Sequence, residues 1–166
     1  MSLFKITPLL VALALLQACG FRPLYGDGTP EFALIQIQPI SDRIGQQLRN
    51  HLLTSLNPKR RSVSPKFTMK TRISESITSL AVKKSAFATR ANLTLKAAFT
   101  LSRVRGGEQL FSSSRSITVS YNILDSELAT LLSVKNARKR AVRELSEDIR
   151  TQLGVYFARR QTDHKG

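Results

Sequence analysis

The strongest constraint on the fold is an alternation of apolar and polar residues between positions 91 and 102, which is interrupted only at Ala98. One parity is apolar and the other polar: Ala91, Leu93, Leu95, Ala97, Phe99 and Leu101 against Asn92, Thr94, Lys96, Thr100 and Ser102. Successive side chains of a strand point to opposite faces, so this segment predicts a strand of a sheet that is buried on one face only.

Two flanking segments extend the same sheet. A second strand begins at Phe67 and keeps its parity to Ile77, after which the break in parity predicts a bulge near Thr78. A third runs from about Gln109 to Tyr121, and Gly106-Gly107 before it predicts a tight hairpin turn. A short first strand is expected at 32–38, before Pro39.

Two segments have helical periodicity. A helix capped by Ser41 or Asp42 is expected to run to about Leu56, with an apolar residue at every fourth position. A longer helix is expected from about Ser126 to Arg159, with Asp125 as a cap. Its apolar stripe consists of Leu131, Val134, Ala141, Leu145, Ile149, Leu153 and Tyr156.

The order strand, helix, three strands, helix predicts an α+β fold. We expect a two-layer sandwich of one four-stranded mixed, mostly antiparallel sheet, with both helices covering its apolar face. The first strand can pair in parallel through its helical crossover, whereas the hairpin-connected strands must be antiparallel.

The N-terminus has the order of a secretory signal peptide. Lys5 precedes a continuous apolar run over residues 6–16, which is shorter than the roughly 20 residues that span a bilayer. Leu16-Gln17-Ala18-Cys19 resembles a bacterial lipobox, in which the cysteine is joined to a diacylglyceryl group and becomes the first residue. The alternative is an ordinary signal peptide with a chance cysteine, but this is the only Cys in the chain, and a secreted chain with one unpaired Cys is otherwise odd.

These features divide the chain into four parts. Residues 1–18 are a signal peptide that is removed, and 19–31 are a lipidated N-terminus and flexible tether rich in Gly and Pro. Residues 32–160 form a single α+β domain, and 161–166 are a frayed tail. Gly20 replaces the Asp that, by resemblance to lipoprotein sorting rules, would retain the protein at the inner membrane, so an outer-membrane location is expected.

Composition points to binding rather than catalysis. The two histidines, His51 and His164, form no metal-ligand cluster with the single Cys, and no serine lies in a nucleophile-elbow context. We therefore expect no enzyme, no metal and no cofactor beyond the covalent lipid on Cys19. The net charge of +15 instead implies a polyanionic partner, which behind a signal peptide means lipid phosphates and lipopolysaccharide (LPS).

Two basic clusters are candidates for that partner. Lys83 and Lys84, with Arg90 nearby, mark the end of a strand pair and could contact phosphates, although lysines also protect strand edges from aggregation. On the last helix Lys135, Lys139, Arg143 and Arg150 fall on one line, which is either a binding stripe or a solvated face. The polar face of the sheet is mostly Ser and Thr; this is either a wet face of good strand formers or a face packed against another polar wall.

The segment Cys19-Gly20-Phe21-Arg22-Pro23-Leu24-Tyr25-Gly26 resembles the start of the LPS-assembly lipoprotein family (LptE-like). The predicted element order over residues 32–160 is similar to that family's fold. The resemblance implies an outer-membrane lipoprotein that assists assembly of the LPS-translocating β-barrel (LptD-like), plugs its lumen and binds LPS for delivery to the outer leaflet. It fixes one residue, Cys19, because the LPS-contacting positions have no motif here.

Two other classes of protein are also compatible with this sequence. One is a lipid- or envelope-binding lipoprotein without a barrel partner, and the other is a nucleic-acid-binding protein. Fractionation separates the second, since a cytosolic and unlipidated chain would support it. Copurification with a barrel separates the first.

Overall fold

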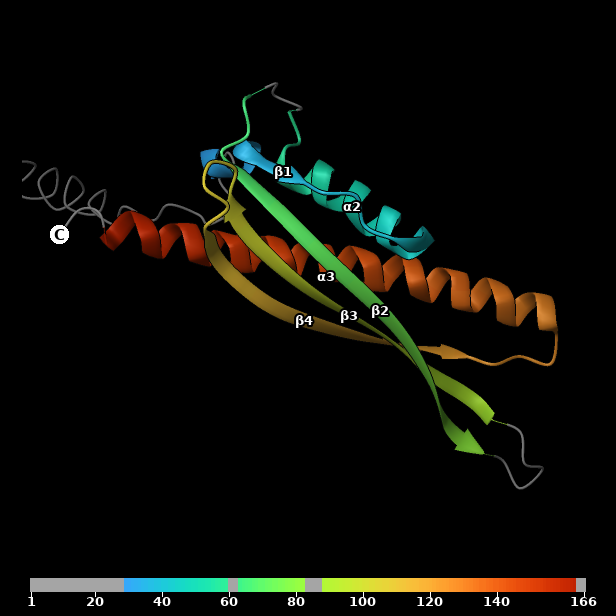
Figure 1. The fold of residues 1–166 in the computed structure, drawn as a ribbon. Helices are drawn as coiled ribbons and strands as arrows, with labels where there is room; N and C mark the ends of the chain where they lie inside the picture. The colour runs from blue at the N-terminus through green and yellow to red at the C-terminus, as the bar shows by residue number, and fades with distance from the viewer. Residues whose placement is uncertain (1–28, 60–62, 83–87, 164–166) are drawn as a thin grey trace, which may run out of the picture.

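The computed structural model describes residues 29–59, 63–82 and 88–163, in which two helices cover one face of a four-stranded sheet (Figure 1). The elements follow in the order 3-10 helix η3 (Pro30–Leu34), β1 (Ile35–Ile37), α2 (Asp42–Leu56), β2 (Phe67–Val82), β3 (Ala88–Arg103), β4 (Gln109–Asn122) and α3 (Glu127–Asp163). The predicted α+β sandwich with the order β-α-β-β-β-α is confirmed.

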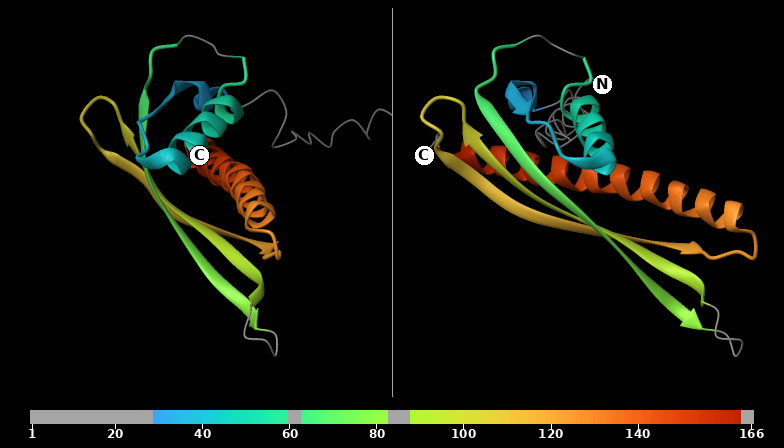
Figure 2. Two further views of the ribbon diagram at one scale, coloured as in Figure 1. Left: turned by 90° about the vertical axis from the view of Figure 1, so that its right-hand side faces the viewer. Right: turned by 45° about the vertical axis from the view of Figure 1, so that its right-hand side comes forward.

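The strands lie in the order β1-β2-β3-β4. β1 pairs in parallel with the start of β2, with Ile35 opposite Phe67, whereas β2, β3 and β4 pair antiparallel along most of their length. β2 and β3 continue past the helical layer at one end of the molecule (Figure 2). The sheet thus has one end that both helices cover and one end that extends away from them.

The core lies between the inner face of the sheet and the two helices. The apolar parity of β3 is fully buried there, as the alternation predicts: Ala91, Leu93, Leu95, Ala97, Phe99 and Leu101 are each at most 1% exposed. Leu48 and Leu52 of α2 and Leu145, Ile149 and Leu153 of α3 pack in the same cluster and are 0% exposed. The apolar residues that helical and strand periodicity identify therefore pack in one core.

The first strand is shorter than predicted, because its first residues form a helical turn instead. Pro30 opens η3, where its fixed φ suits a helical start. The turn buries Phe32, whose ring centroid lies 6.1 Å from that of Phe157 in α3. Packing against the far end of α3 thus overrides the extended conformation expected for residues 32–34.

The sequence overestimates how far the core covers α3. Leu131 was expected in the buried stripe but is 62% exposed, and Leu128 and Leu132 beside it are 67% and 50% exposed. The helix begins at Glu127, where Ser126 Oγ accepts the Ala129 N–H at 3.4 Å, so Ser126 rather than Asp125 makes the cap contact. The first turns of α3 project beyond α2, which leaves their apolar stripe open.

Glycine is required at one helical position and at one turn. A Cβ on Gly45 of α2 would lie 2.6 Å from Cγ2 of the buried Ile40, so only glycine lets the chain before the helix approach it this closely. Gly106 and Gly107 have φ of 86° and 67°, the left-handed conformation of the predicted hairpin turn.

The predicted bulge falls between Ser79 and Ala81, next to its expected place.

Candidate functional site

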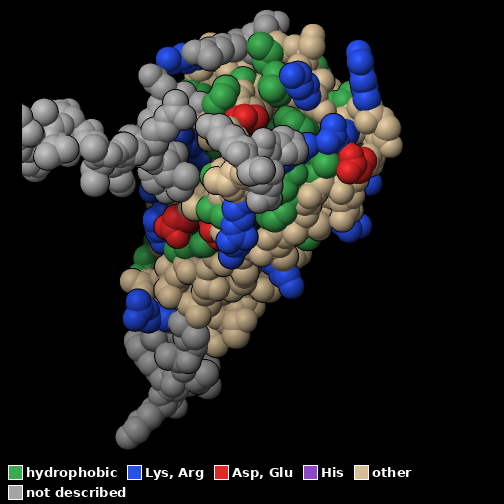
Figure 3. All heavy atoms as spheres, turned by 90° about the vertical axis from the view of Figure 1, so that its left-hand side faces the viewer, with side chains coloured by type: hydrophobic (Ala, Val, Ile, Leu, Met, Phe, Trp, Pro, Cys, Tyr) green, Lys and Arg blue, Asp and Glu red, His purple; other side chains and the backbone are tan. Residues whose placement is uncertain are grey.

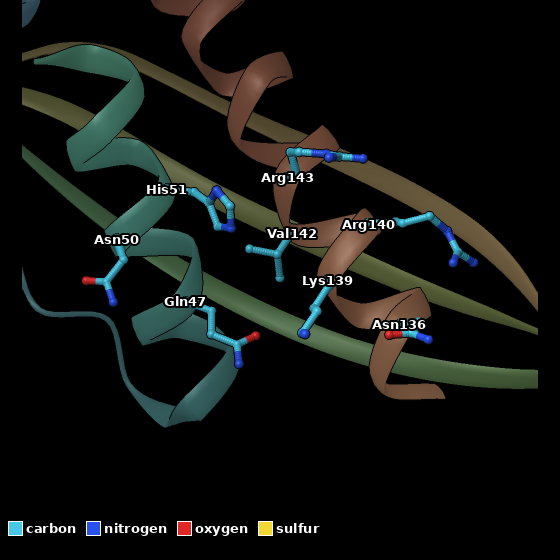
Figure 4. A pocket seen from close by; sticks show the side chains of 8 residues that line it. All are labelled: Gln47, Asn50, His51, Asn136, Lys139, Arg140, Val142 and Arg143. Atoms are coloured by element: carbon cyan, nitrogen blue, oxygen red, sulfur yellow. The ribbon is translucent and has the colours of Figure 1, made fainter. Parts of the chain in front are cut away.

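A groove of about 620 Å³ lies between α2 and α3 (Figure 4). α2 contributes amide and imidazole groups, and α3 contributes three cations, an amide and the buried Val142. The lining residues are Gln47, Asn50, His51, Asn136, Lys139, Arg140, Val142 and Arg143.

A second cavity of about 510 Å³ continues the first toward the start of both helices. The two share Gln47 and Lys139, and we call them together the interhelical groove. The second cavity adds cationic and apolar walls and one acid. Its lining residues are Asp42, Arg43, Ile44, Gln47, Leu131, Lys135, Arg138 and Lys139.

The groove concentrates positive charge. Within the described part of the chain, Lys139 and Arg143 are exposed and make no ion pair, and Asp42 is the one acid among the lining residues. Arg140 donates to the carbonyl oxygen of Ser120 in β4 at 3.4 Å, which ties one groove cation to the sheet edge. Guanidinium and ammonium groups beside amide donors suit phosphate or carboxylate oxygens.

Ion pairs between sheet and helix hold the α3 wall in place. Arg138 donates two hydrogen bonds to the Glu75 carboxylate, at 2.6 and 2.8 Å. The hydrogen bond to Glu75 raises the pKa of the Arg138 guanidinium above its ordinary value, although burial acts in the opposite direction. Arg115 of β4, which the sequence places on the inward parity, reaches Asp148 of α3 at 3.8 Å. Both acids thus neutralise cations that the core face would otherwise leave unpaired.

An exposed leucine stripe adjoins the groove. It comprises Leu124, Leu128, Leu131 and Leu132, which are 47–67% exposed. Thr130 fixes the first of them, since its hydroxyl accepts the Leu124 N–H at 2.8 Å and donates to the Leu124 carbonyl at 3.0 Å. Leu131 also lines the second cavity beside Lys135 and Lys139, so the apolar stripe and the cations share one surface.

The structure brings three members of the predicted helical stripe together. Lys135, Lys139 and Arg143 line the interhelical groove. Arg150 lies outside the groove lining, 3.5 Å from Glu147.

The predicted strand-end cluster is only partly described. Arg90 is exposed on β3, opposite Asn122, and shares the outer parity of Asn92. Lys83, Lys84 and Cys19, the predicted lipidation residue, lie outside the described residues.

Sequence reasoning missed most of the residues that line the groove. Arg43 and His51 come from α2, and Arg140 lies beside the predicted stripe on α3. Polar residues one turn apart on α2, Gln47 and His51 among them, were the available signal. That signal identifies a polar face but not the helix it meets, so the groove needed the tertiary structure.

Hydroxyl side chains are the most frequent type on the outer face of the sheet. Three cross-strand contacts join β3 and β4: Thr94 to Thr118 at 2.9 Å, Ser120 to Asn92 at 2.7 Å, and Thr100 to Ser112 at 3.5 Å. The face shown in Figure 3 carries several separate Lys and Arg side chains with few acids between them.

The described residues contain no group of three or more His, Cys, Asp or Glu side chains placed to hold a metal ion. Among the described helices, none is both long enough and apolar enough to cross a bilayer.

Three solved structures with this fold are described as bacterial lipoproteins. One described as a lipoprotein, from Caulobacter crescentus, matches with a TM-score of 0.61 at 20% identity, covering 77% of this chain and 93% of its own. Rare lipoprotein B of Shewanella oneidensis gives 0.58 at 12%, covering 80% and 98%. A minor lipoprotein of Acinetobacter baumannii gives 0.55 at 14%, covering 73% and 91%. At these identities the likeness defines the fold class alone.

The family follows from the sequence itself. Residues 32–153 match the model of the LptE, lipopolysaccharide-assembly family, and the chain belongs to that family. No curated protein sequence matches the chain. The match spans β1 to most of α3, including every described residue of the interhelical groove.

Proposed function

We propose that this protein is an outer-membrane lipoprotein, anchored by lipid on Cys19, that binds LPS and assists the assembly of an LptD-like β-barrel, whose lumen it plugs. It acts by binding rather than by catalysis. Membership of the LPS-assembly family over residues 32–153 supports this role. The high positive charge of the chain suits LPS, since its lipid part carries phosphates.

One observation carries the LPS part of the proposal: the exposed leucine stripe borders the cations of the interhelical groove. Lipid A is an amphiphile with anionic phosphates at one end and acyl chains at the other. Phosphates would bind Lys139, Arg140 and Arg143, while acyl chains would cover Leu128 and Leu131. Burying these leucines gains roughly 25 cal/mol for each Å² of apolar surface removed from water.

The groove proposal has a direct test with a matched control. The triple variant Lys139→Gln, Arg140→Gln, Arg143→Gln removes three groove charges, and we expect binding of purified LPS to weaken at least about tenfold, because charge-assisted contacts are lost. The control Lys70→Gln, Arg72→Gln, Lys96→Gln removes equal charge from the outer face of the sheet. Equal LPS affinity in both variants would rule out the groove as the site.

The strand-end cations Lys83, Lys84 and Arg90 are the second candidate site. The exposed position of Arg90 near one end of β3 supports it, since cations at a rigid strand end can reach clustered phosphates. Substituting these three by Ser is the third arm of the same binding assay. Loss of LPS binding in this arm alone would move the site from the groove to the strand end.

A lipoprotein that binds envelope lipids without any barrel is the rival function. The exposed leucines and groove cations would serve it equally well. Purification of the native protein in detergent separates the two, because only the proposed function requires an outer-membrane barrel to copurify.

A further inference from the structure

The outer face of β2, β3 and β4 combines hydroxyl side chains with unpaired cations and has no acid among its described residues. Pairing in register aligns its rows, which run from Lys70–Thr100–Ser112 to Thr78–Asn92–Ser120. Lys70 and Arg72 are two residues apart on β2, and Lys96 of β3 lies diagonal to Arg72 in the register. These three side chains are exposed and make no ion pair within the described part of the chain.

Strand propensity does not account for this composition. Thr favours strands, but Ser is not among the favoured residues, and Ser112, Ser114, Ser116 and Ser120 dominate the outer parity of β4. A face that only meets water is normally a mixture of both charge signs. Here neutral hydroxyl and amide groups are joined to one another across strands, and every charged side chain is positive.

Rows of hydroxyl side chains can be buried against another protein surface at low cost. Burial of a charge without a partner is very costly, whereas a hydroxyl group that keeps a hydrogen bond loses little. The three cations then need carboxylates opposite them, since an unpaired buried charge would cost several kcal/mol. The face is therefore complementary to a polar wall with acidic groups near its centre.

The shape favours a protein wall over a lipid headgroup. The interhelical groove lies on the helical side, whereas a small ligand needs a concave site. At about 3.3 Å per residue, strands of 16 residues extend roughly 50 Å, which exceeds the roughly 25 Å apolar band of an outer-membrane barrel. The interior wall of such a barrel is polar.

From these observations we infer that the outer face of the sheet, centred on Lys70, Arg72 and Lys96, docks against an acidic stretch of the partner barrel's inner wall. This inference rests on the proposed function for the identity of the partner and adds the surface, the orientation and the charge of the contact. The interhelical groove and the leucine stripe then face away from that acidic stretch.

The test separates docking from LPS binding. Lys70→Glu, Arg72→Glu, Lys96→Glu should reduce barrel copurification at least about tenfold at physiological salt, because like charges then oppose one another. LPS binding by the purified variant should stay within twofold of the parent. The matched control, Lys139→Glu, Arg140→Glu, Arg143→Glu, should keep the barrel and lose LPS. If the Lys70, Arg72 and Lys96 variant copurifies with the barrel as well as the parent does, the inference is overturned. It is also overturned if that variant loses LPS binding but keeps the barrel.

A second measurement does not depend on the fold of a triple variant. A photo-crosslinking amino acid placed singly at exposed Ser114 or Ser116 should crosslink to the acidic stretch of the barrel wall in cells, and one at exposed Asn50 in the groove should not crosslink to that stretch. Crosslinks from Asn50 and none from the serines reverse the orientation and overturn the inference. If the parent protein itself copurifies with no barrel, the proposed function fails. If the parent binds the barrel through another face, the proposed function stands and only this inference fails.

Discussion

Replacing Leu145 by Ala tests the packing that creates the groove. Leu145 lies on α3, is 0% exposed and belongs to the cluster that joins α3 to β3 and α2. The substitution removes about three CH₂-sized groups, worth about 2.4 kcal/mol in transfer free energy at about 0.8 kcal/mol each. A residual cavity adds to this, because a long helix that two ion pairs hold against a sheet collapses little.

We therefore expect the free energy of unfolding to fall by about 3–4 kcal/mol, within the range known for buried Leu→Ala changes. At about 2.1 cal/mol/K per residue, a domain of roughly 130 residues unfolds with an entropy near 0.27 kcal/mol/K, so Tm should fall by about 10–15 °C. Chemical and thermal denaturation followed by circular dichroism measure both quantities.

Leu128→Ala is the matched control. It makes the same substitution in the same helix at a residue that is 67% exposed, so the free energy of unfolding should change by less than about 0.5 kcal/mol. Equal losses from the two substitutions would refute the placement of α3 on the sheet.

Three further predictions concern the backbone, the ion pair and the anchor. Gly45→Ala should destabilise the domain by about 1–3 kcal/mol despite the better helix propensity of Ala, because its Cβ would meet Ile40; Gln46→Ala, exposed on the same helix, should not. A double-mutant cycle with Glu75→Gln and Arg138→Met should give a coupling of about 1 kcal/mol in urea unfolding, since water partly screens an arginine that is about a third exposed; additive losses would show that the two hydrogen bonds contribute nothing jointly. Mass spectrometry of the native membrane protein should find a diacylglyceryl group on Cys19 as the first residue, and an unmodified N-terminus would contradict the lipobox reading.

Local patterns predicted most of the fold because the spacing of apolar residues in each element identifies its buried face. The alternation around Leu95 and the four-residue spacing from Leu48 to Leu56 both identify core residues that the structure buries. The sequence-based predictions were wrong where a tertiary contact decides the local conformation or the burial of a side chain. Phe32 enters a helical turn because it packs on Phe157, more than a hundred residues away, and Leu131 is exposed because α2 does not reach the start of α3.

The candidate site divides in the same way. Lys135, Lys139 and Arg143 were identifiable because helical periodicity puts them on one side of a single segment. Arg43 and His51 were not, since their place in the groove depends on how α2 packs beside α3. The cation triad of the outer sheet face likewise depends on register, because Lys96 meets Arg72 only through the β2–β3 pairing.

The most direct test of the whole account is purification of the tagged, full-length protein from native outer membranes in mild detergent, followed by identification of what copurifies. The account predicts an outer-membrane β-barrel protein in about equal amount, together with bound LPS that the groove variant Lys139→Gln, Arg140→Gln, Arg143→Gln loses while the barrel remains. A parent protein recovered without any barrel, or a groove variant that retains the same LPS as the parent, would contradict it.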